Sequence, residues 1–366
     1  MRASVAIVFT GLLVAGCAAA ASVALDVPSA GLATELVASE PVVAEPRPPI
    51  RYGVAEAPPR TDGAIRIASY NVLNLFDAVN DPDLEGEFDD LPMATDPVRA
   101  ANIAAMIRRM DADVIALQEV ESEACLIWFR DTYLSDLGYE HVVSRDVGYY
   151  RGVECSILSR FPIEDVQVWP QASLRDVVAD GPGFAARPAD ADAGLEYQRS
   201  PLRATIRVRP DYALTVYCLH HKSGRTYSWK REAEALRTVE KIAAEMAAAP
   251  DRNIVVMGDF NAAPWDKSLR LYLEAGLVDT QAHRVIPRSR DADQTEANLA
   301  KTHESGRVID YILCNGAAYR EIVPGTAVVL GKPYDTEYDW RNDPYPSWYA
   351  SDHHPLMVEL MPVDRR

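Results

Sequence analysis

The 366-residue sequence is short of basic residues, and it contains few cysteines. Lysine and arginine number 37 against 54 aspartate and glutamate, which gives a formal net charge of −17. Such an acidic chain is a poor general binder of polyanions, because folded proteins that coat nucleic acid present a net basic surface. Hydrophobic residues nevertheless make up 48% of the chain, which excludes a disordered or collagen-like protein.

The five cysteines show no CxxC or Cys-His spacing, which excludes a structural zinc site of the common kinds. Beyond residue 17, four cysteines remain: Cys125, Cys155, Cys218 and Cys314. Three of them lie within apolar, strand-like runs, where a free thiol behaves as a small buried hydrophobe. We favour buried free thiols over disulfides, for which three pairings are open.

The first 17 residues have the layout of a signal peptide. Arg2 precedes an apolar run over 5–15, which is shorter than the roughly 20 residues of a membrane-spanning helix. The run ends in Val14-Ala15-Gly16-Cys17, which resembles the bacterial lipobox, where the cysteine becomes the lipidated first residue. We therefore expect an exported envelope lipoprotein, periplasmic or associated with the outer membrane, that is held by its lipid anchor without a transmembrane helix in the mature chain. The alternative is a secreted protein cleaved after one of the alanines at 18–21.

Residues 18–60 contain seven prolines among Ala, Val and Glu, which predicts a disordered, extended tether. From 61 to 366, apolar runs with strand and helix patterns alternate without a Pro-rich or Gly-rich linker, so we expect a single folded domain. Predicted helices cover 98–110, 228–248 and 268–273. Predicted strands cover 65–73, 114–117, 153–159, 202–208, 213–220, 253–258, 308–313 and 355–361.

Polar side chains stand at the ends of several of these strands, where a rigid backbone delivers them to one crevice. A single Asp, Asn or His at such a place is usually a turn former, a cap or a partly buried residue. Six groups together are hard to explain in that way. They are Asn71, Gln118-Glu119, His220, Gly258-Asp259-Phe260-Asn261, Asp310 and Ser351-Asp352-His353.

This ordered set resembles the endonuclease/exonuclease/phosphatase superfamily. The segments 71–77 and 157–163 also resemble its branch of bacterial extracellular nucleases. The resemblance implies a four-layer α/β/β/α sandwich of the deoxyribonuclease I type, in which two mostly antiparallel mixed sheets face each other and the site lies at one edge. It also implies that 61–366 is the catalytic domain of a divalent-metal-dependent hydrolase of phosphoric esters.

The chemistry of phosphodiester cleavage assigns roles to these residues, because an anionic ester needs a hard cation, an activated water and help for the leaving oxygen. Glu119 is the best metal ligand, with Asn71 and Asp352 nearby, and one or two carboxylates suit Mg²⁺. Mn²⁺ is a second choice, and Ca²⁺ is also compatible. By resemblance, Asp259 orients or deprotonates the attacking water, and Asn261 donates a hydrogen bond to the phosphate.

Two histidines complete the predicted site. By resemblance, His353 pairs with Asp310, which fixes its tautomer, so that it acts as a base or a phosphate clamp. His220 faces it across the phosphate and stabilises the transition state or the leaving oxygen. Glu154 is a candidate to steady His220. His221 and His354 are interpreted as neighbours, since adjacent strand residues point to opposite faces.

Charge and aromatic residues bear on the substrate. The stretch 197–231 holds eight bases against one acid, and we expect Lys222, Arg199 and Arg225 to bind substrate. The acidic segment 77–96 is either a solvated loop or a second cation site. Six aromatic residues between 334 and 349 form either a stacking wall or a loop pinned by its own packing.

The sequence therefore predicts a nuclease of the bacterial envelope that cleaves phosphodiester bonds in nucleic acid. The alternative enzyme acts on lipid headgroups or small phosphate esters. A binding module without activity is disfavoured, because every chemical position retains a competent residue. Leu73 and Gly224 depart from the nuclease-like branch, which leaves the substrate open.

Overall fold

Two six-stranded mixed sheets form the centre of the protein, which we describe from a computed structural model. The structure describes residues 49–82, 90–178, 182–188, 195–281 and 298–364. The first sheet contains, in spatial order, β11 (Val328–Val329), β12 (Leu356–Leu360), β1 (Ile65–Leu75), β2 (Val114–Val120), β4 (Glu154–Ser159) and β3 (His141–Ser144). The second contains β5 (Ile163–Gln167), β6 (Leu202–Arg209), β7 (Tyr212–His220), β8 (Asn253–Asp259), β10 (Asp310–Cys314) and β9 (Val278–Asp279).

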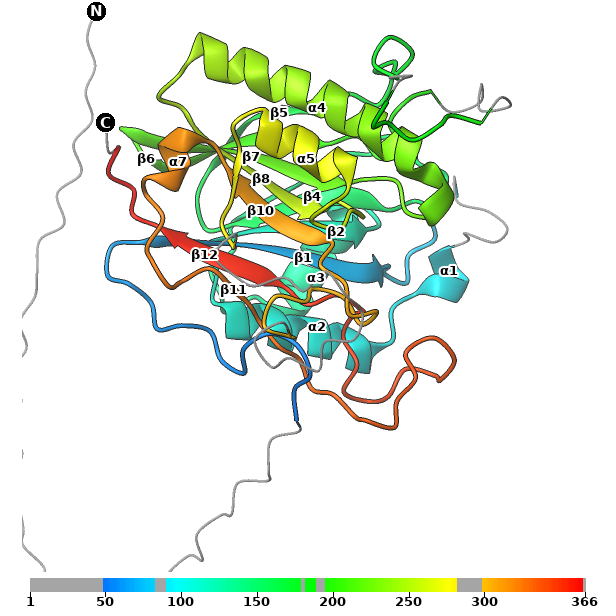
Figure 1. The fold of residues 1–366 in the computed structure, drawn as a ribbon. Helices are drawn as coiled ribbons and strands as arrows, with labels where there is room; N and C mark the ends of the chain where they lie inside the picture. The colour runs from blue at the N-terminus through cyan, green and yellow to red at the C-terminus, as the bar shows by residue number, and fades with distance from the viewer. Residues whose placement is uncertain (1–48, 83–89, 179–181, 189–194, 282–297, 365–366) are drawn as a thin grey trace, which may run out of the picture. The chain divides into compact units, whose positions relative to one another are not determined.

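Only β1–β2 and β7–β8 pair in parallel among the strands of these two sheets, so both are mostly antiparallel, as predicted. The helices lie on the outer faces (Figure 1). The longer ones are α2 (Pro97–Met110), α3 (Glu123–Tyr133), α4 (Ser228–Ala248) and α5 (Lys267–Glu274). The short ones are α1 (Asp90–Met93), α7 (Gly316–Tyr319) and the 3₁₀ turn Arg225–Tyr227. The layers form the expected α/β/β/α sandwich.

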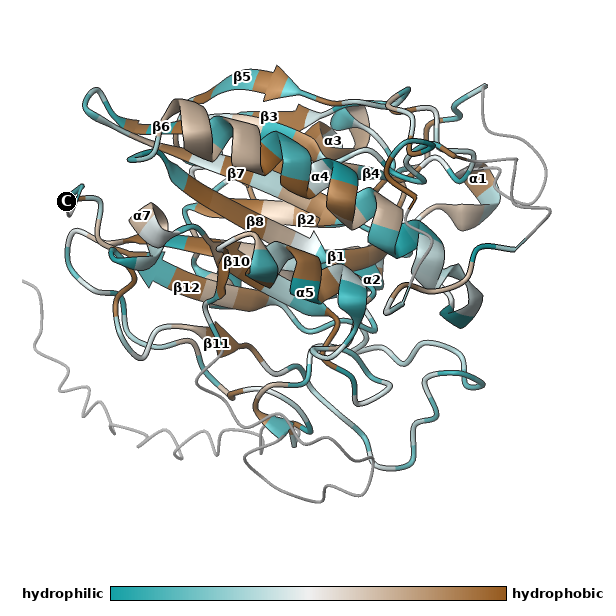
Figure 2. Cartoon of the chain, turned by 45° about the horizontal axis from the view of Figure 1, so that its top comes forward, coloured by the Kyte–Doolittle hydropathy of each residue, from teal (hydrophilic) through white to brown (hydrophobic). Residues whose placement is uncertain are grey.

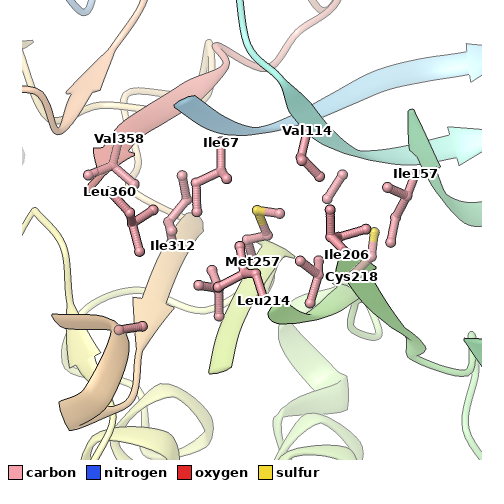
Figure 3. Packing of buried hydrophobic residues seen from close by; sticks show 14 of the residues in the cluster. Ile67, Val114, Ile157, Ile206, Leu214, Cys218, Met257, Ile312, Val358 and Leu360 are labelled. Carbon is pink, nitrogen blue, oxygen red and sulfur yellow. The ribbon is translucent and has the colours of Figure 1, made fainter. Parts of the chain in front are cut away.

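The main hydrophobic core fills the space between the two sheets. Ile67, Val114 and Val358 of the first sheet meet Met257 and Ile312 of the second (Figure 3). Two further clusters lie outside the sheets, one beneath α2 and α3 and the other beneath α4 and α5. The strands are predominantly apolar, and α4 is mixed in character, since one face is buried and the other is exposed to water (Figure 2).

The four cysteines beyond residue 17 are buried free thiols, as the sequence predicts. Cys155 and Cys218 belong to the core between the sheets, and Cys125 is a buried residue of α3 that packs in the cluster beneath α2 and α3. Burial raises the pKa of Cys314 and Cys125 far above the usual range of a thiol. Thiols in such surroundings stay protonated and act as packing groups.

The folded unit begins earlier than residue 60. Ile50 and Val54 form β-bridges with Pro333 and Leu330, and the Pro58 carbonyl accepts a hydrogen bond from Arg66. The prediction of a disordered tether is therefore wrong for 49–60, because these residues have backbone partners in the domain. The signal peptide 1–17, Cys17 and the tether 18–48 lie outside the described residues. None of the described helices is both long and apolar enough to cross a bilayer.

Candidate active site

Three neighbouring strands of the second sheet align the first three site residues. The register pairs His220 on β7 with Asp259 on β8, and Asp259 with Asp310 on β10. Gly258 makes this alignment possible, because its φ is 148° and a Cβ there would lie 2.0 Å from the carbonyl oxygen of Leu219. Only glycine fits so close an approach of two backbones. The Gly-Asp dipeptide thus places a carboxylate between two other functional groups.

The first sheet delivers Glu119 and Asn71 through irregular backbone. Glu119 falls at a register shift between β2 and β4, and its φ is 66°. A bulge of this kind re-aims a side chain that regular pairing would direct elsewhere. The amide of Asn71 is held at both ends, since Oδ1 accepts from the Leu73 N–H (3.0 Å) and Nδ2 donates to Asp259 Oδ2 (3.3 Å). Left-handed residues at functional positions typically store a small backbone strain.

The side chain of His353, which precedes β12 of the first sheet, reaches Asp310 of the second sheet. The Ser351 hydroxyl accepts from the His353 N–H and donates to the Asn71 carbonyl, which fixes the segment before β12. The Nδ1 atom of His353 lies 3.0 Å from both carboxylate oxygens of Asp310. Thr302 donates to Asp310 Oδ2 at 2.6 Å. The predicted His353–Asp310 pair is therefore present, and Thr302 orients its carboxylate.

These groups converge on Asp259. Its Oδ2 accepts from Asn261 Nδ2 (3.0 Å) and lies 3.4 Å from His220 Nε2 and 3.8 Å from His353 Nε2. The Oε1 atom of Glu119 is 3.7 Å from His220 Nε2. A single pocket of about 1120 Å³ is lined by Glu119, His220, Asp259, Asn261 and His353. The pocket has the size of a ligand site for a nucleotide-scale molecule.

The two histidines differ in their electrostatic surroundings. Burial by itself disfavours a charged ring, yet the carboxylates of Asp310 and Asp352 outweigh it and raise the pKa of His353 to about 10. For His220, burial and then the Arg199 guanidinium lower the pKa well below its ordinary value. The site thus holds one cationic and one neutral imidazole, which is how one site supplies both a charge clamp and a neutral hydrogen-bonding group.

A divalent cation fits the donor set at this edge of the sheets. Glu119 and Asp352 offer carboxylate oxygens, which are the ligands that Mg²⁺ and Mn²⁺ accept. Asp352 Oδ1 is buried and accepts no hydrogen bond from the described residues. An ionised oxygen without a donor in such a place is suited to a cation. Asn71 keeps one lone pair of its carbonyl oxygen for a further partner.

The comparison with known families agrees with this geometry. The model of the endonuclease/exonuclease/phosphatase family matches residues 68–353. The chain belongs to this family. Its members are hydrolases that act on phosphoester bonds and generally depend on a divalent metal. No significant match is found among curated proteins.

Several solved structures are similar to this family member. The human Nocturnin catalytic domain with bound sulfate is 17% identical, with a TM-score of 0.49, and the match covers 81% of this chain and 94% of that one. For truncated Caenorhabditis elegans TDP2 the values are 13%, 0.49, 81% and 97%. For an endonuclease/exonuclease/phosphatase from Bacteroides vulgatus they are 17%, 0.48, 81% and 98%.

The three predicted substrate-binding bases lie in different places in this endonuclease/exonuclease/phosphatase protein. Arg225 is exposed and lines the pocket. Lys222 lies outside the pocket lining and places its Nζ 4.3 Å from the centre of the Tyr227 ring. Arg199 is 2% exposed, and it donates to the carbonyls of His220 and His221. The prediction for Arg199 is corrected, because its donors hold the end of β7 instead of facing the pocket.

Glu154 also differs from its predicted role. Its Oε1 accepts from the Val147 N–H, and no hydrogen bond joins it to His220 in the described part of the chain. The Nδ1 atom of His220 is buried without a hydrogen-bond partner among the described residues. Burial raises the pKa of Glu154 to about 8. Glu154 is therefore bonded to backbone, and no hydrogen bond in the described structure lets it steady His220 as predicted.

The neighbouring histidines are structural, as predicted. His221 Nδ1 lies 3.3 Å from Glu234, and its Nε2 is hydrogen-bonded to Tyr272. His354 lies beside Glu304 and makes an edge contact with Tyr52. Neither lines the pocket.

The aromatic loop before Asp352 combines both interpretations. Tyr345 stacks on Tyr349 with ring centres 4.4 Å apart, and Tyr338 and Trp348 pack edge-on nearby, so most of the loop is pinned by its own packing. Trp340 is the exception, since it lines the pocket. Trp265, which is 56% exposed, also lines the pocket.

Several pocket residues are not predicted from the sequence. His303 contacts both Asp352 and His353, and Arg51 and Tyr52 reach the pocket from the supposed tether. A local signal existed for His303, since it adjoins Thr302 only a few residues before Asp310. No local signal identifies Arg51 and Tyr52, because their contacts are distant in sequence.

The acidic segment 77–96 contributes no described residue to this pocket. Its residues 83–89 lie outside the described part. Asp77 is buried beside Glu121 and Cys125, and the possible ligand atoms of the three lie within 4.8 Å of one another. Asp77 therefore belongs to a separate buried cluster and does not line the pocket.

Proposed function

We propose that this protein is a nuclease that hydrolyses phosphodiester bonds with the help of a divalent cation, Mg²⁺ or Mn²⁺, at the bacterial cell envelope. The observation that carries the proposal is the convergence of Glu119, His220, Asp259 and His353 in one pocket. These groups supply a cation ligand, neutral and charged imidazoles and a carboxylate for water. Phosphodiester cleavage uses groups of these kinds for acid–base and metal-ion catalysis.

The charge of the pocket supports an anionic substrate. The chain as a whole has 37 bases and 54 acids, whereas six bases and four acids line the pocket. The bases are Arg51, Arg225, Arg231, Lys301, Arg307 and Arg341, and the acids are Glu119, Asp259, Asp266 and Asp352. The local excess of positive charge attracts phosphate even though the molecule is acidic overall.

Aromatic side chains at the pocket favour nucleic acid over a simple phosphate ester. Trp265 is exposed and lines the pocket, and Trp340 packs edge-on against His303. The exposed Trp265 and the half-buried Trp340, which has the Arg341 guanidinium 4.6 Å from its ring centre, provide stacking surfaces that every base can use. A lipid headgroup or a small phosphate ester would use the same phosphate-binding groups but would gain less from two separate indole surfaces.

The side chains of the protein have separable tasks in this reaction. Asp259, held by Asn71 and Asn261, orients the attacking water. His353, held by Asp310, clamps the phosphate, and His220 stabilises the leaving oxygen from the other side. Glu119 and Asp352 would hold the cation, which supplies Lewis-acid stabilisation of the phosphate charge when bound.

A substrate panel tests the proposal. Plasmid DNA, RNA, sphingomyelin and bis-p-nitrophenyl phosphate are incubated with Mg²⁺, Mn²⁺ or Ca²⁺, with and without chelator. We expect chelator-sensitive cleavage of DNA or RNA. Cleavage of sphingomyelin alone would replace the nuclease assignment with the lipid alternative, and inertness on all four substrates would refute the enzyme.

Glu119→Gln and His353→Ala test the assigned groups. Each should lower kcat by at least roughly 10²-fold, because each removes a charge that acts on the transition state. Glu274→Gln serves as the control, since Glu274 is an exposed residue of α5 paired with Lys267. Folded variants with nearly full activity would contradict the assigned roles.

The envelope location is proposed from Cys17 and the apolar run before it. Mass spectrometry of protein isolated from membranes is expected to find an acylated Cys17 as the first residue. Cys17→Ala should release the enzyme from the membrane fraction. An unmodified terminus beginning at residue 18 or later would show a secreted protein instead.

A further inference from the structure

His303 lies between the catalytic centre and the wall of the pocket. Its ring packs edge-on against His353, with ring centres 4.7 Å apart, and against Trp340 at 5.1 Å. His303 is 6% exposed, and its Nε2 lies 3.2 Å from Asp352 Oδ2. The side chain therefore touches a predicted cation ligand, a predicted catalytic residue and the aromatic loop at the same time.

The hydrogen bonds of His303 determine its tautomer. The backbone N–H of Ser305 donates to His303 Nδ1 at 2.9 Å, so this nitrogen carries a lone pair and no proton. A neutral imidazole has one N–H, which is then on Nε2. Nε2 therefore donates to Asp352 Oδ2.

The same tautomer excludes His303 as a metal ligand. An imidazole that binds a metal through Nε2 normally carries its proton on Nδ1 and donates it to an acceptor. Here Nδ1 faces an N–H donor, so ligation through Nε2 would leave the ring without any proton. His303, Asp352 and His353 are close enough to suggest a three-ligand site. The hydrogen bond from the Ser305 N–H to Nδ1 excludes His303 as one of the ligands.

We propose that His303 is a positioning residue that holds the Asp352 carboxylate for the cation. The hydrogen bond occupies Oδ2 and fixes the rotation of the carboxylate, and Oδ1 is left buried without a hydrogen-bond partner in the described structure. Outer hydrogen bonds to ligating groups typically change metal affinity 10- to 100-fold. The inference rests on the proposed function, because that function assigns the cation to Asp352.

The chain of contacts continues from His303 to the pocket mouth. The Ser305 hydroxyl lies 2.8 Å from His303 Nδ1 and accepts from Arg307 Nε at 2.9 Å. Arg307 is exposed and lines the pocket. The turn 303–307 is thus one structural unit that carries an arginine at one end and supports Asp352 at the other.

Three substitutions at residue 303 separate the hydrogen bond from packing. His303→Gln can place an amide N–H near the position of Nε2 and keep the donor to Asp352. His303→Asn keeps an acceptor for the Ser305 N–H but is too short to reach Asp352. His303→Phe keeps a ring against Trp340 and His353 but has no donor. His141→Phe on β3, at the far edge of the first sheet, is the matched control.

Mn²⁺ affinity without substrate is measured by the EPR signal of free Mn²⁺, and circular dichroism confirms folding. We expect Asn and Phe at 303 to weaken Mn²⁺ binding 10- to 100-fold, and Gln to stay within about threefold of the wild type. Undiminished affinity in folded Phe and Asn variants overturns the positioning role. If His303→Gln binds Mn²⁺ as weakly as His303→Phe does, the hydrogen bond to Asp352 is not the cause of the positioning.

The outcome is distinguishable from failure of the proposed function. The binding assay involves no turnover. If the wild type is a nuclease, but His303→Phe binds Mn²⁺ as tightly as the wild type does, only the role of His303 is refuted. If the wild type hydrolyses no substrate, but His303→Phe binds Mn²⁺ more weakly than the wild type does, only the nuclease assignment is refuted. A wild type that binds no Mn²⁺ overturns the positioning role together with the cation in the proposed mechanism.

Discussion

Glu154 is buried as a neutral acid, and its replacement by glutamine should stabilise the protein in alkaline solution. Its side chain is 3% exposed, and burial raises the pKa from 4.5 to about 8. The folded protein therefore holds this proton more tightly than the unfolded chain does. Stability is undiminished below pH 4.5 and falls as the pH rises toward 8. Each pKa unit is worth about 1.4 kcal/mol, so the total loss is about 5 kcal/mol.

Glu154→Gln keeps the acceptor for the Val147 N–H and cannot ionise. Urea denaturation of both proteins between pH 4.5 and 9 measures the free energy of unfolding. The variant should match the wild type near pH 4.5 and exceed it by about 5 kcal/mol at pH 9. The control is Glu164→Gln, on the edge strand β5, whose side chain is 42% exposed. Equal pH dependence in the Glu154 variant and the wild type would refute the reasoning.

Three further substitutions test other parts of the structure. Gly258→Ala should destabilise the fold by more than about 3 kcal/mol in denaturant, because its Cβ would collide with Leu219; an unchanged midpoint would show that the strands can separate. Glu359→Ala leaves the buried guanidinium of Arg66 unpaired and should lower the free energy of unfolding by about 3–5 kcal/mol, whereas a loss below 1 kcal/mol would contradict a tightly buried pair. Arg199→Lys should reduce kcat roughly tenfold, since lysine cannot hold two carbonyls in the same way, without changing the salt dependence of KM; a changed salt dependence would restore the predicted contact with substrate.

The sequence predicts the long elements well because their patterns are regular. The helix expected over 228–248 is α4, and the expected strands form the centres of both sheets. The short strands His141–Ser144 and Ile163–Gln167 are missed. Each lies at an edge of its sheet, where pairing on only one side permits a short strand with a weak pattern. The end of the tether is misplaced because composition does not reveal backbone pairing with residues 330 and 333.

The site residues that carry chemistry are predictable, but their supports are not. The residue types in the short motifs that contain Glu119, Asp259 and His353 indicate the roles of these residues. The contacts of Arg199 and Glu154 depend on the direction of a side chain, which charge patterns do not contain. The tautomer of His303 depends on a backbone N–H two residues further along. Such supports become visible only when the register of the strands and the shape of the turns are known.

Because the site is divided between two sheets, the hydrophobic core between them sets the spacing of the catalytic groups. Asp310 begins a strand of one sheet, and His353 precedes a strand of the other, with side chains such as Met257 and Val358 filling the space between. The thickness of that apolar layer determines how far apart the two halves of the pocket lie. In a library of random variants, substitutions that leave the protein folded and soluble but inactive should therefore occur in this hydrophobic layer as well as among the polar site residues. A screen for solubility alone would overlook them.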